Sequence, residues 1–183
     1  FYIMEYLEGA DLRFVLRYLE RQNERFSVRA VLEIGSAVAS ALDAAYNRPP
    51  FAGEKPLRVI HRDIKPNNIM LDDMGMTKVL DFGVARSELD SRESETQELQ
   101  FGSLEYMAPE RLFFEPETPA SDVYSLGATL FELLCGEKVG KARGRPERHT
   151  AFVDERLRHL VSYLGVQGMI ASELESLLRS CLL

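Results

Sequence analysis

A short polar segment in the first half of the chain holds the side chains best suited to chemistry. His61-Arg62-Asp63-Ile64-Lys65-Pro66-Asn67-Asn68 places a carboxylate, an ammonium and an amide within six positions. Asp63 could deprotonate a hydroxyl, Lys65 could contact a transferring phosphoryl group, and the amide oxygen of Asn68 could bind magnesium. Such positioned charges are typical of phosphoryl transfer, because electrostatic stabilisation supplies most of the catalysis in that reaction.

A second carboxylate follows a predicted β-hairpin. Short apolar runs at 69–71 and 79–80 predict two strands, and Asp72-Asp73-Met74-Gly75 predicts the turn between them. Asp81-Phe82-Gly83 comes directly after the hairpin, so Asp81 is expected at the same end of the strands as Asn68. Magnesium prefers one or two carboxylates together with phosphate oxygens and water, so these two residues would be a sufficient protein contribution.

Most of the elements that must position this hairpin are predicted helices. Apolar side chains recur at steps of three and four along several segments, and proline or polar residues mark the ends. The run from Val123 to Leu134 is apolar almost all round, which indicates a central buried helix. The other expected helices are one capped by Asp11, a long one from Ser27 to about residue 47, a short one between Pro109 and Pro119, and two near 152–164 and 171–182. A further strand is predicted at Val59-Ile60, and a mobile loop at 86–100.

Composition excludes several classes of protein. The chain has 183 residues, 29 acidic and 22 basic side chains and a net charge of −7, with 45% hydrophobic residues. These values indicate one soluble domain and argue against disorder and against nucleic acid as the main partner. No segment is long and apolar enough to predict a membrane span, and no signal peptide is visible. We expect Cys135 and Cys181 to be core thiols, and both chain ends to be truncations within a longer protein.

The three motifs 61–68, Asp81-Phe82-Gly83 and Ala108-Pro109-Glu110 together resemble the eukaryotic-type (Hanks-type) serine/threonine protein kinase family. The resemblance covers the whole chain and is closer to bacterial members. It implies an α+β, mainly helical fold: the hinge and C-terminal lobe of a partial kinase domain over 1–183, with a small β-hairpin carrying the catalytic and magnesium loops. The N-terminal lobe would be absent, and the activation segment would run over 81–110.

The resemblance also implies a role for each residue that matches a family motif. Asp63 would be the catalytic base, Lys65 the phosphate-contacting lysine, and Asn68 and Asp81 the magnesium ligands. Ser103 would hydrogen-bond both Asp63 and Lys65. ATP would be bound near Met4, Glu5, Leu7, Asp11 and Met70. Structural or regulatory roles would fall to His61, Arg62, Phe82, Gly83, Glu110 and Asp122, with Asp122 holding the catalytic loop.

The implied function is ATP-dependent, magnesium-assisted phosphorylation of Ser or Thr on proteins. The fragment alone is expected to be inactive, in the cytoplasm and without membrane contact, while the parent protein could be membrane-anchored. Two other readings remain open: a pseudokinase-like regulatory or scaffolding module, and a small-molecule phosphotransferase.

Two further expectations concern Arg62 and the histidines. Arg62 would need an anion from the activation segment, for which phosphorylated Ser91, Ser94 or Thr96 are candidates and Glu95 or Glu98 could partly substitute. His61 is expected to be packed structurally, whereas His149 and His159 are expected to face solvent.

Overall fold

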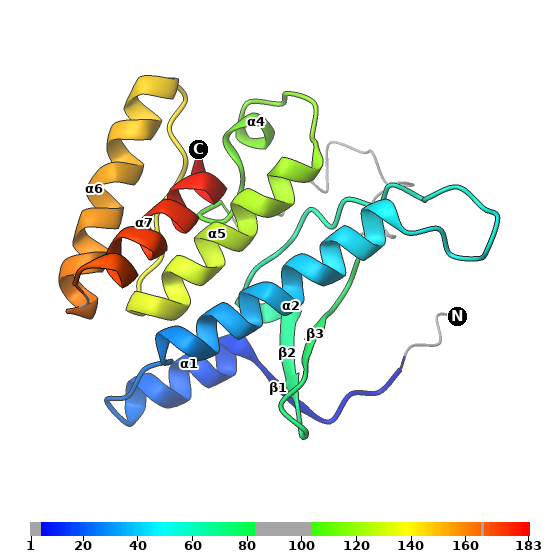
Figure 1. Cartoon of the computed structure of the whole chain (residues 1–183), viewed down its shortest axis with the longest axis horizontal. Helices are drawn as coiled ribbons and strands as arrows, with labels where there is room; N and C mark the ends of the chain where they lie inside the picture. Colours follow the sequence, from blue (N-terminus) through cyan, green and yellow to red (C-terminus); the bar gives the residue numbers. More distant parts are fainter. Residues whose placement is uncertain (1–4, 83–103, 166) are drawn as a thin grey trace.

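The computed structural model describes residues 5–82, 104–165 and 167–183, and Figure 1 shows their arrangement. The described elements are mainly helices together with one small antiparallel sheet, which agrees with the expected α+β class. In chain order they are β1 (Gly9–Asp11), α1 (Leu12–Arg21), α2 (Val28–Asn47), η1 (Pro66–Asn68), β2 (Ile69–Asp72), β3 (Thr77–Val79), α4 (Pro109–Leu112), α5 (Pro119–Cys135), α6 (Pro146–Leu164) and α7 (Met169–Leu182).

The sheet has the strand order β1-β2-β3, with both neighbours antiparallel. The predicted β2–β3 hairpin is confirmed, and Ile69 pairs with Val79. We did not predict β1, because Glu8-Gly9-Ala10 indicated the end of a strand before the helix that Asp11 caps. In the structure a Cβ atom at Gly9 would lie 2.2 Å from the carbonyl oxygen of Leu71, so glycine is what allows β1 to approach β2 this closely.

The predicted strand at Val59-Ile60 is wrong. These residues belong to no strand, and the Val59 N–H donates instead to the carbonyl oxygen of Ala45 near the end of α2, at 3.3 Å. An apolar run of two residues forms a strand only beside a neighbouring strand. Here the acceptor of the Val59 N–H belongs to α2 and not to a strand.

Helix α5 is the centre of the core, as the sequence predicted. Figure 1 shows α5 between α2 on one side and α6 and α7 on the other, and these helices pack against it. Nearly all of its side chains are buried, although Val123 is 40% exposed. Thr118 caps its first turn in a capping box, and Gly136 ends it in the left-handed conformation.

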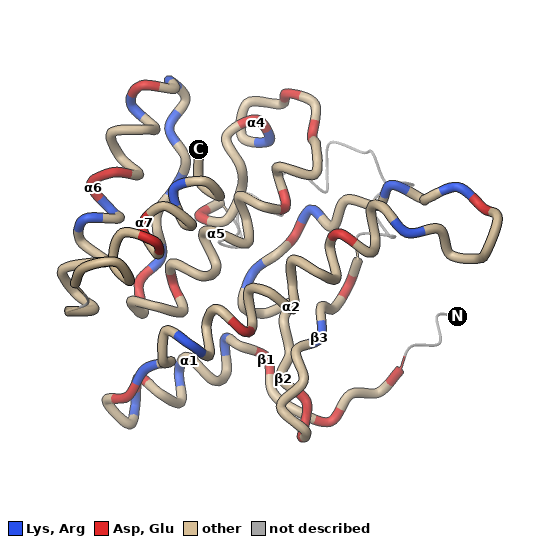
Figure 2. Tube along the Cα trace, in the orientation of Figure 1, with Lys and Arg blue, Asp and Glu red and all other residues tan. Residues whose placement is uncertain are grey.

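Helix α6 begins at Pro146, earlier than predicted, because proline is favoured in the first turn of a helix. His149 therefore lies on this helix and is buried, with Nε2 2.9 Å from the carbonyl oxygen of Leu182, so its predicted solvent exposure is wrong. His159 is exposed, as predicted. Basic and acidic residues are interspersed along α6 (Figure 2).

The two cysteines lie in apolar surroundings. Cys135 is buried and Cys181 is half-buried. Burial raises the pKa of both thiols, and that of Cys135 reaches about 11. Within the described residues, no helix combines the length and the apolar character that a membrane span needs.

Candidate active site

The loop before β2 brings three of the predicted catalytic and magnesium-binding side chains into direct contact. Lys65 Nζ lies 2.8 Å from Asp63 Oδ2, and Asn68 Nδ2 donates to both the backbone carbonyl and Oδ2 of Asp63, at 2.7 Å each. Ile64 and Pro66 alternate with these residues and are buried, so they anchor the loop while its polar side chains stay partly exposed. A carboxylate fixed by an ammonium and an amide is held in one orientation, as a general base requires.

The side-chain amide of Asn68 is oriented by Asp63. Because its nitrogen donates to Asp63, its oxygen Oδ1 faces away from that carboxylate. An amide oxygen is a suitable magnesium ligand, so this orientation fits the predicted role. In the three described ranges, no group of three or more His, Cys, Asp or Glu side chains could hold a metal. The pairing of Asn68 with Asp81 at one ion therefore stays a prediction.

Asp81 follows β3 beside the start of β2. The Leu80 N–H donates to the carbonyl oxygen of Asn68 at 2.9 Å, which places the next residue, Asp81, close to the Asn68 backbone. The side chain of Asp81 is exposed, and its φ of 56° lies in the left-handed region. Aspartate tolerates this conformation better than most residues with a Cβ atom.

His61 is a structural residue of this loop, as predicted from its sequence context. Its side chain is fully buried, and its ring centroid lies 4.8 Å from that of Phe82. Nδ1 accepts from the Asp63 N–H at 3.3 Å, and Nε2 lies 2.8 Å from the carbonyl oxygen of Leu80. Both contacts are satisfied by the tautomer that carries hydrogen on Nε2. His61 thus connects the loop that carries Asp63 to the end of the hairpin.

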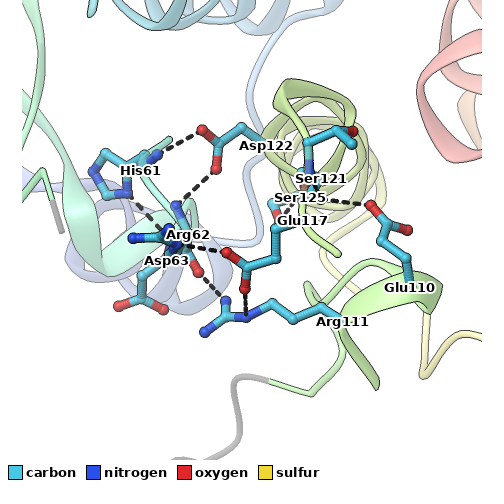
Figure 3. A network of polar contacts seen from close by, with 10 residues as sticks. His61, Arg62, Asp63, Glu110, Arg111, Glu117, Ser121, Asp122 and Ser125 are labelled. Atoms are coloured by element: carbon cyan, nitrogen blue, oxygen red, sulfur yellow. Dashed lines mark hydrogen bonds and ion pairs between the residues drawn. The ribbon is translucent and has the colours of Figure 1, made fainter. Parts of the chain in front are cut away.

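Asp122 holds the same loop from the first turn of α5 (Figure 3). Its carboxylate is 4% exposed and accepts from two consecutive backbone N–H groups, those of His61 at 2.7 Å and Arg62 at 2.8 Å. Burial raises the pKa of Asp122, and the two backbone hydrogen bonds partly offset this rise. The contact joins the central helix directly to the residues before Asp63.

A carboxylate that the sequence did not point to, Glu117, pairs with Arg62. Its Oε2 lies 2.5 Å from Arg62 Nε, and its Oε1 lies 2.9 Å from Arg111 Nε. Glu110, the acidic residue of the Ala108-Pro109-Glu110 motif, accepts from Ser121 Oγ at 2.5 Å. Glu117 belongs to no motif, so only the need of Arg62 for an anion could have prompted a search for it.

A second network, also missed from the sequence, lies among α1, the segment before α4, and α5. Arg13 NH1 is 2.7 Å from Glu132 Oε1, and the Tyr106 hydroxyl donates to Glu132 Oε2 at 2.5 Å. Arg13 NH2 also donates to the Tyr106 oxygen at 2.5 Å. Burial, and then the hydrogen bond to Glu132, raise the pKa of Tyr106 above its ordinary range. No spacing rule connects residues so far apart in sequence.

The predicted nucleotide-binding residues are only partly brought together. Asp11 pairs with Met70 across β1 and β2, and its Oδ1 caps α1 by accepting from the Phe14 N–H at 2.7 Å. Glu5 is exposed and Leu7 is half-buried, both before β1. Several predicted residues lie outside the described residues: Met4, Gly83, Ser91, Ser94, Glu95, Thr96, Glu98 and Ser103.

Comparison with known proteins identifies the family. The family model for the protein kinase domain matches residues 1–183. The chain is 38% identical over 141 residues to serine/threonine-protein kinase A of Synechocystis sp., covering 75% of this chain and 26% of that protein. It is 35% identical over 136 residues to serine/threonine-protein kinase PknB of Mycolicibacterium smegmatis, covering 74% and 20%. It is also 35% identical over 134 residues to MAP kinase kinase MKK1/SSP32 of Saccharomyces cerevisiae, covering 73% and 24%.

These relatives agree with the predicted resemblance to Hanks-type kinases, including bacterial ones. The matched regions span about a quarter or less of the length of each relative. Because the family model matches the chain from its first residue to its last, the chain belongs to the protein kinase domain family.

Proposed function

We propose that the full-length protein that contains this chain is a serine/threonine protein kinase, which transfers the γ-phosphoryl group of ATP to Ser or Thr hydroxyls of other proteins. The observation that carries the proposal is the contact of Asp63 with both Lys65 and Asn68 on a loop anchored by buried residues. Residues 1–183 would form the hinge and C-terminal lobe, with 81–110 as the activation segment. This lobe would lie in the cytoplasm, where ATP is available, while the parent protein could be membrane-anchored.

In this mechanism Asp63 accepts the proton of the attacking Ser or Thr hydroxyl. The hydroxyl oxygen forms a bond to the γ-phosphorus, the bond from that phosphorus to the bridging oxygen of ATP breaks, and ADP leaves. Lys65 contacts the transferring group and offsets its charge, and its contact with Asp63 keeps base and phosphoryl group side by side. Asn68 and Asp81 would hold magnesium, which supplies neutralisation of phosphate charge when it is bound.

The contacts of Asp63 favour a catalytic function over that of a binding-only module. A pseudokinase-like scaffold has no need for a carboxylate fixed by both an ammonium and an amide, yet Asp63 makes both contacts while it remains 24% exposed. A small-molecule phosphotransferase would need the same contacts. The distinction between protein and metabolite substrates therefore depends on experiment.

Incubation of the full-length protein with labelled ATP, magnesium and a mixed peptide library tests the proposal, with Asp63→Ala as the control variant. We expect label on Ser and Thr of peptides with the wild type, and its loss with Asp63→Ala. Label on metabolites alone would indicate a small-molecule phosphotransferase. Absence of any transfer, despite nucleotide binding, would indicate the scaffolding module.

A further inference from the structure

Glu117 joins two arginines from different parts of the fold. Arg62 comes from the loop before Asp63, Arg111 comes from α4, and Glu117 lies in the connection between α4 and α5. One carboxylate oxygen contacts each guanidinium, and Arg111 NH1 also donates to the backbone carbonyl of Arg62 (Figure 3). The three side chains are 18–36% exposed, so their charges are only partly screened by water.

The backbone of Arg62 needs to be held in place. Its φ of 72° is in the left-handed region, which residues with a Cβ atom disfavour, and such outliers persist only where the surroundings impose them. The Arg62 N–H is held by Asp122, its carbonyl by Arg111, and its side chain by Glu117. The next residue is Asp63, so a change in this backbone conformation would displace the carboxylate that we propose as the base.

Glu117 also places a negative charge between the guanidinium groups of Arg62 and Arg111. Arg111 donates to the Arg62 carbonyl, and this contact brings two guanidinium groups close together. Glu110, the acidic side chain of α4, accepts from Ser121. Removal of the Glu117 charge would remove its attraction for both guanidinium groups, and the contact of Arg111 with the Arg62 carbonyl would weaken.

We propose that Glu117 is a positioning residue for Asp63. Its carboxylate clamps Arg62 and Arg111 and so maintains the left-handed turn before the base. In this way an internal carboxylate supplies the anion for Arg62, and the loop is set without an added phosphate. The kinetic part of this inference rests on the proposed kinase function, whereas its structural part does not.

The test compares Glu117→Gln, which removes the charge at nearly constant size, with Glu117→Asp, which keeps it. Glu115→Gln is the matched control, because Glu115 is an exposed acid in the same connection. In the full-length protein we expect Glu117→Gln to lower kcat about 10- to 100-fold. The KM for ATP should stay within about twofold, and Glu117→Asp should recover part of the loss. A Ser91/Ser94/Thr96 triple alanine form should remain active and show the same response to Glu117→Gln.

Hydrogen exchange separates this inference from the proposed function, because it needs no activity. Backbone amides of residues 61–63 should exchange about tenfold faster or more in Glu117→Gln, but not in Glu115→Gln. If these amides exchange as slowly in Glu117→Gln as in the wild type, the proposed clamp is wrong even if the protein is a kinase. If the triple alanine form is as inactive as Asp63→Asn, an added phosphate is required and the inference fails. Exchange that responds as expected without any phosphoryl transfer would instead overturn the proposed function alone.

Discussion

At the scale of single residues, the loop before Asp63 depends on a buried carboxylate that accepts two adjacent backbone N–H groups. The two carboxylate oxygens of Asp122 accept hydrogen bonds from the backbone N–H groups of His61 and Arg62 at the same time. A neutral side chain with a single acceptor oxygen would bind these two N–H groups less strongly. The cost is burial of a charge, which raises the pKa of Asp122. The residue therefore combines a favourable local geometry with an unfavourable electrostatic environment.

Asp122→Asn should destabilise the protein by about 1–3 kcal/mol, because its amide offers one acceptor oxygen for two buried N–H groups. The native pKa of Asp122 is raised, so its contribution to stability is fully present below the ordinary value of 3.8 and decreases as pH rises through the native pKa. Asparagine does not titrate. The stability difference between wild type and Asp122→Asn should therefore be larger at about pH 4 than at about pH 7.

Urea unfolding across this pH range measures the difference, with Asp73→Asn as an exposed control. A difference that grows toward neutral pH would show that the hydrogen bonds to the ionised carboxylate outweigh its burial. The pKa of Asp122 would then be lowered in the folded protein, and the expected direction would be wrong.

The proximity of the polar side chains within 61–68 could be predicted because it is local. Asp63, Lys65 and Asn68 lie within one short loop, where their spacing alone places them near one another. The partners of Arg62 could not be predicted in the same way, because Glu117 and Arg111 come from α4 and the connection after it. Only the packing of that segment against the loop brings them within reach.

At the scale of elements, helix periodicity was the most informative signal. The buried helix at 123–134 and the long helix after Ser27 are confirmed, because each has a strong apolar pattern and a capping residue. Helix α6 begins before the predicted start near residue 152, because the apolar pattern alone does not reveal a first turn that begins with proline. Strand β1 was missed because its pairing with β2 depends on a residue without a side chain, which no apolar pattern reveals.

Two glycines, Gly35 within α2 and Gly127 within α5, lie where their helix contacts another helix, and they should respond differently to alanine. At Gly127 a Cβ atom would lie 2.6 Å from the Cβ of Cys181 on α7, whereas at Gly35 it would lie 3.1 Å from side-chain carbons of Leu130 on α5. Overpacking costs about 1–3 kcal/mol, while alanine gains about 1 kcal/mol of helix propensity over glycine. We therefore expect Gly127→Ala to lower the urea midpoint and Gly35→Ala to leave it nearly unchanged. Equal midpoints for the two variants would contradict the close packing of α5 and α7.

At the scale of the whole molecule, the Arg13–Tyr106–Glu132 network joins the start of the chain to its central helix. Glu132 is only 2% exposed, and water therefore contributes little to the stabilisation of its charge. The Arg13 guanidinium and the Tyr106 hydroxyl stabilise this charge instead. The network also connects the segment just before Ala108-Pro109-Glu110 to α5. The position of that segment is therefore coupled to the core through Tyr106.

Tyr106→Phe should lower the free energy of unfolding by about 1–3 kcal/mol, because it removes the hydroxyl that donates to buried Glu132. Tyr6→Phe is a suitable control, since Tyr6 is 88% exposed. Chemical denaturation followed by circular dichroism measures both. If the two substitutions have equal effects, the hydroxyl contributes nothing to the link between α1 and α5.

Asp63, Asn68 and Asp81 are proposed to serve one phosphoryl-transfer site. The test of this shared site is the dependence of peptide phosphorylation on magnesium concentration. It is measured with the full-length protein and with its Asn68→Ala, Asp81→Asn and Asp63→Asn variants. We expect Asn68→Ala and Asp81→Asn each to raise the magnesium concentration needed for half-maximal rate. Asn68→Ala removes an oxygen ligand, and Asp81→Asn replaces a charged carboxylate with a neutral amide, which binds magnesium more weakly. Asp63→Asn should abolish transfer at every magnesium concentration. Unchanged magnesium dependence in either ligand variant, or substantial transfer by Asp63→Asn, would contradict the shared site.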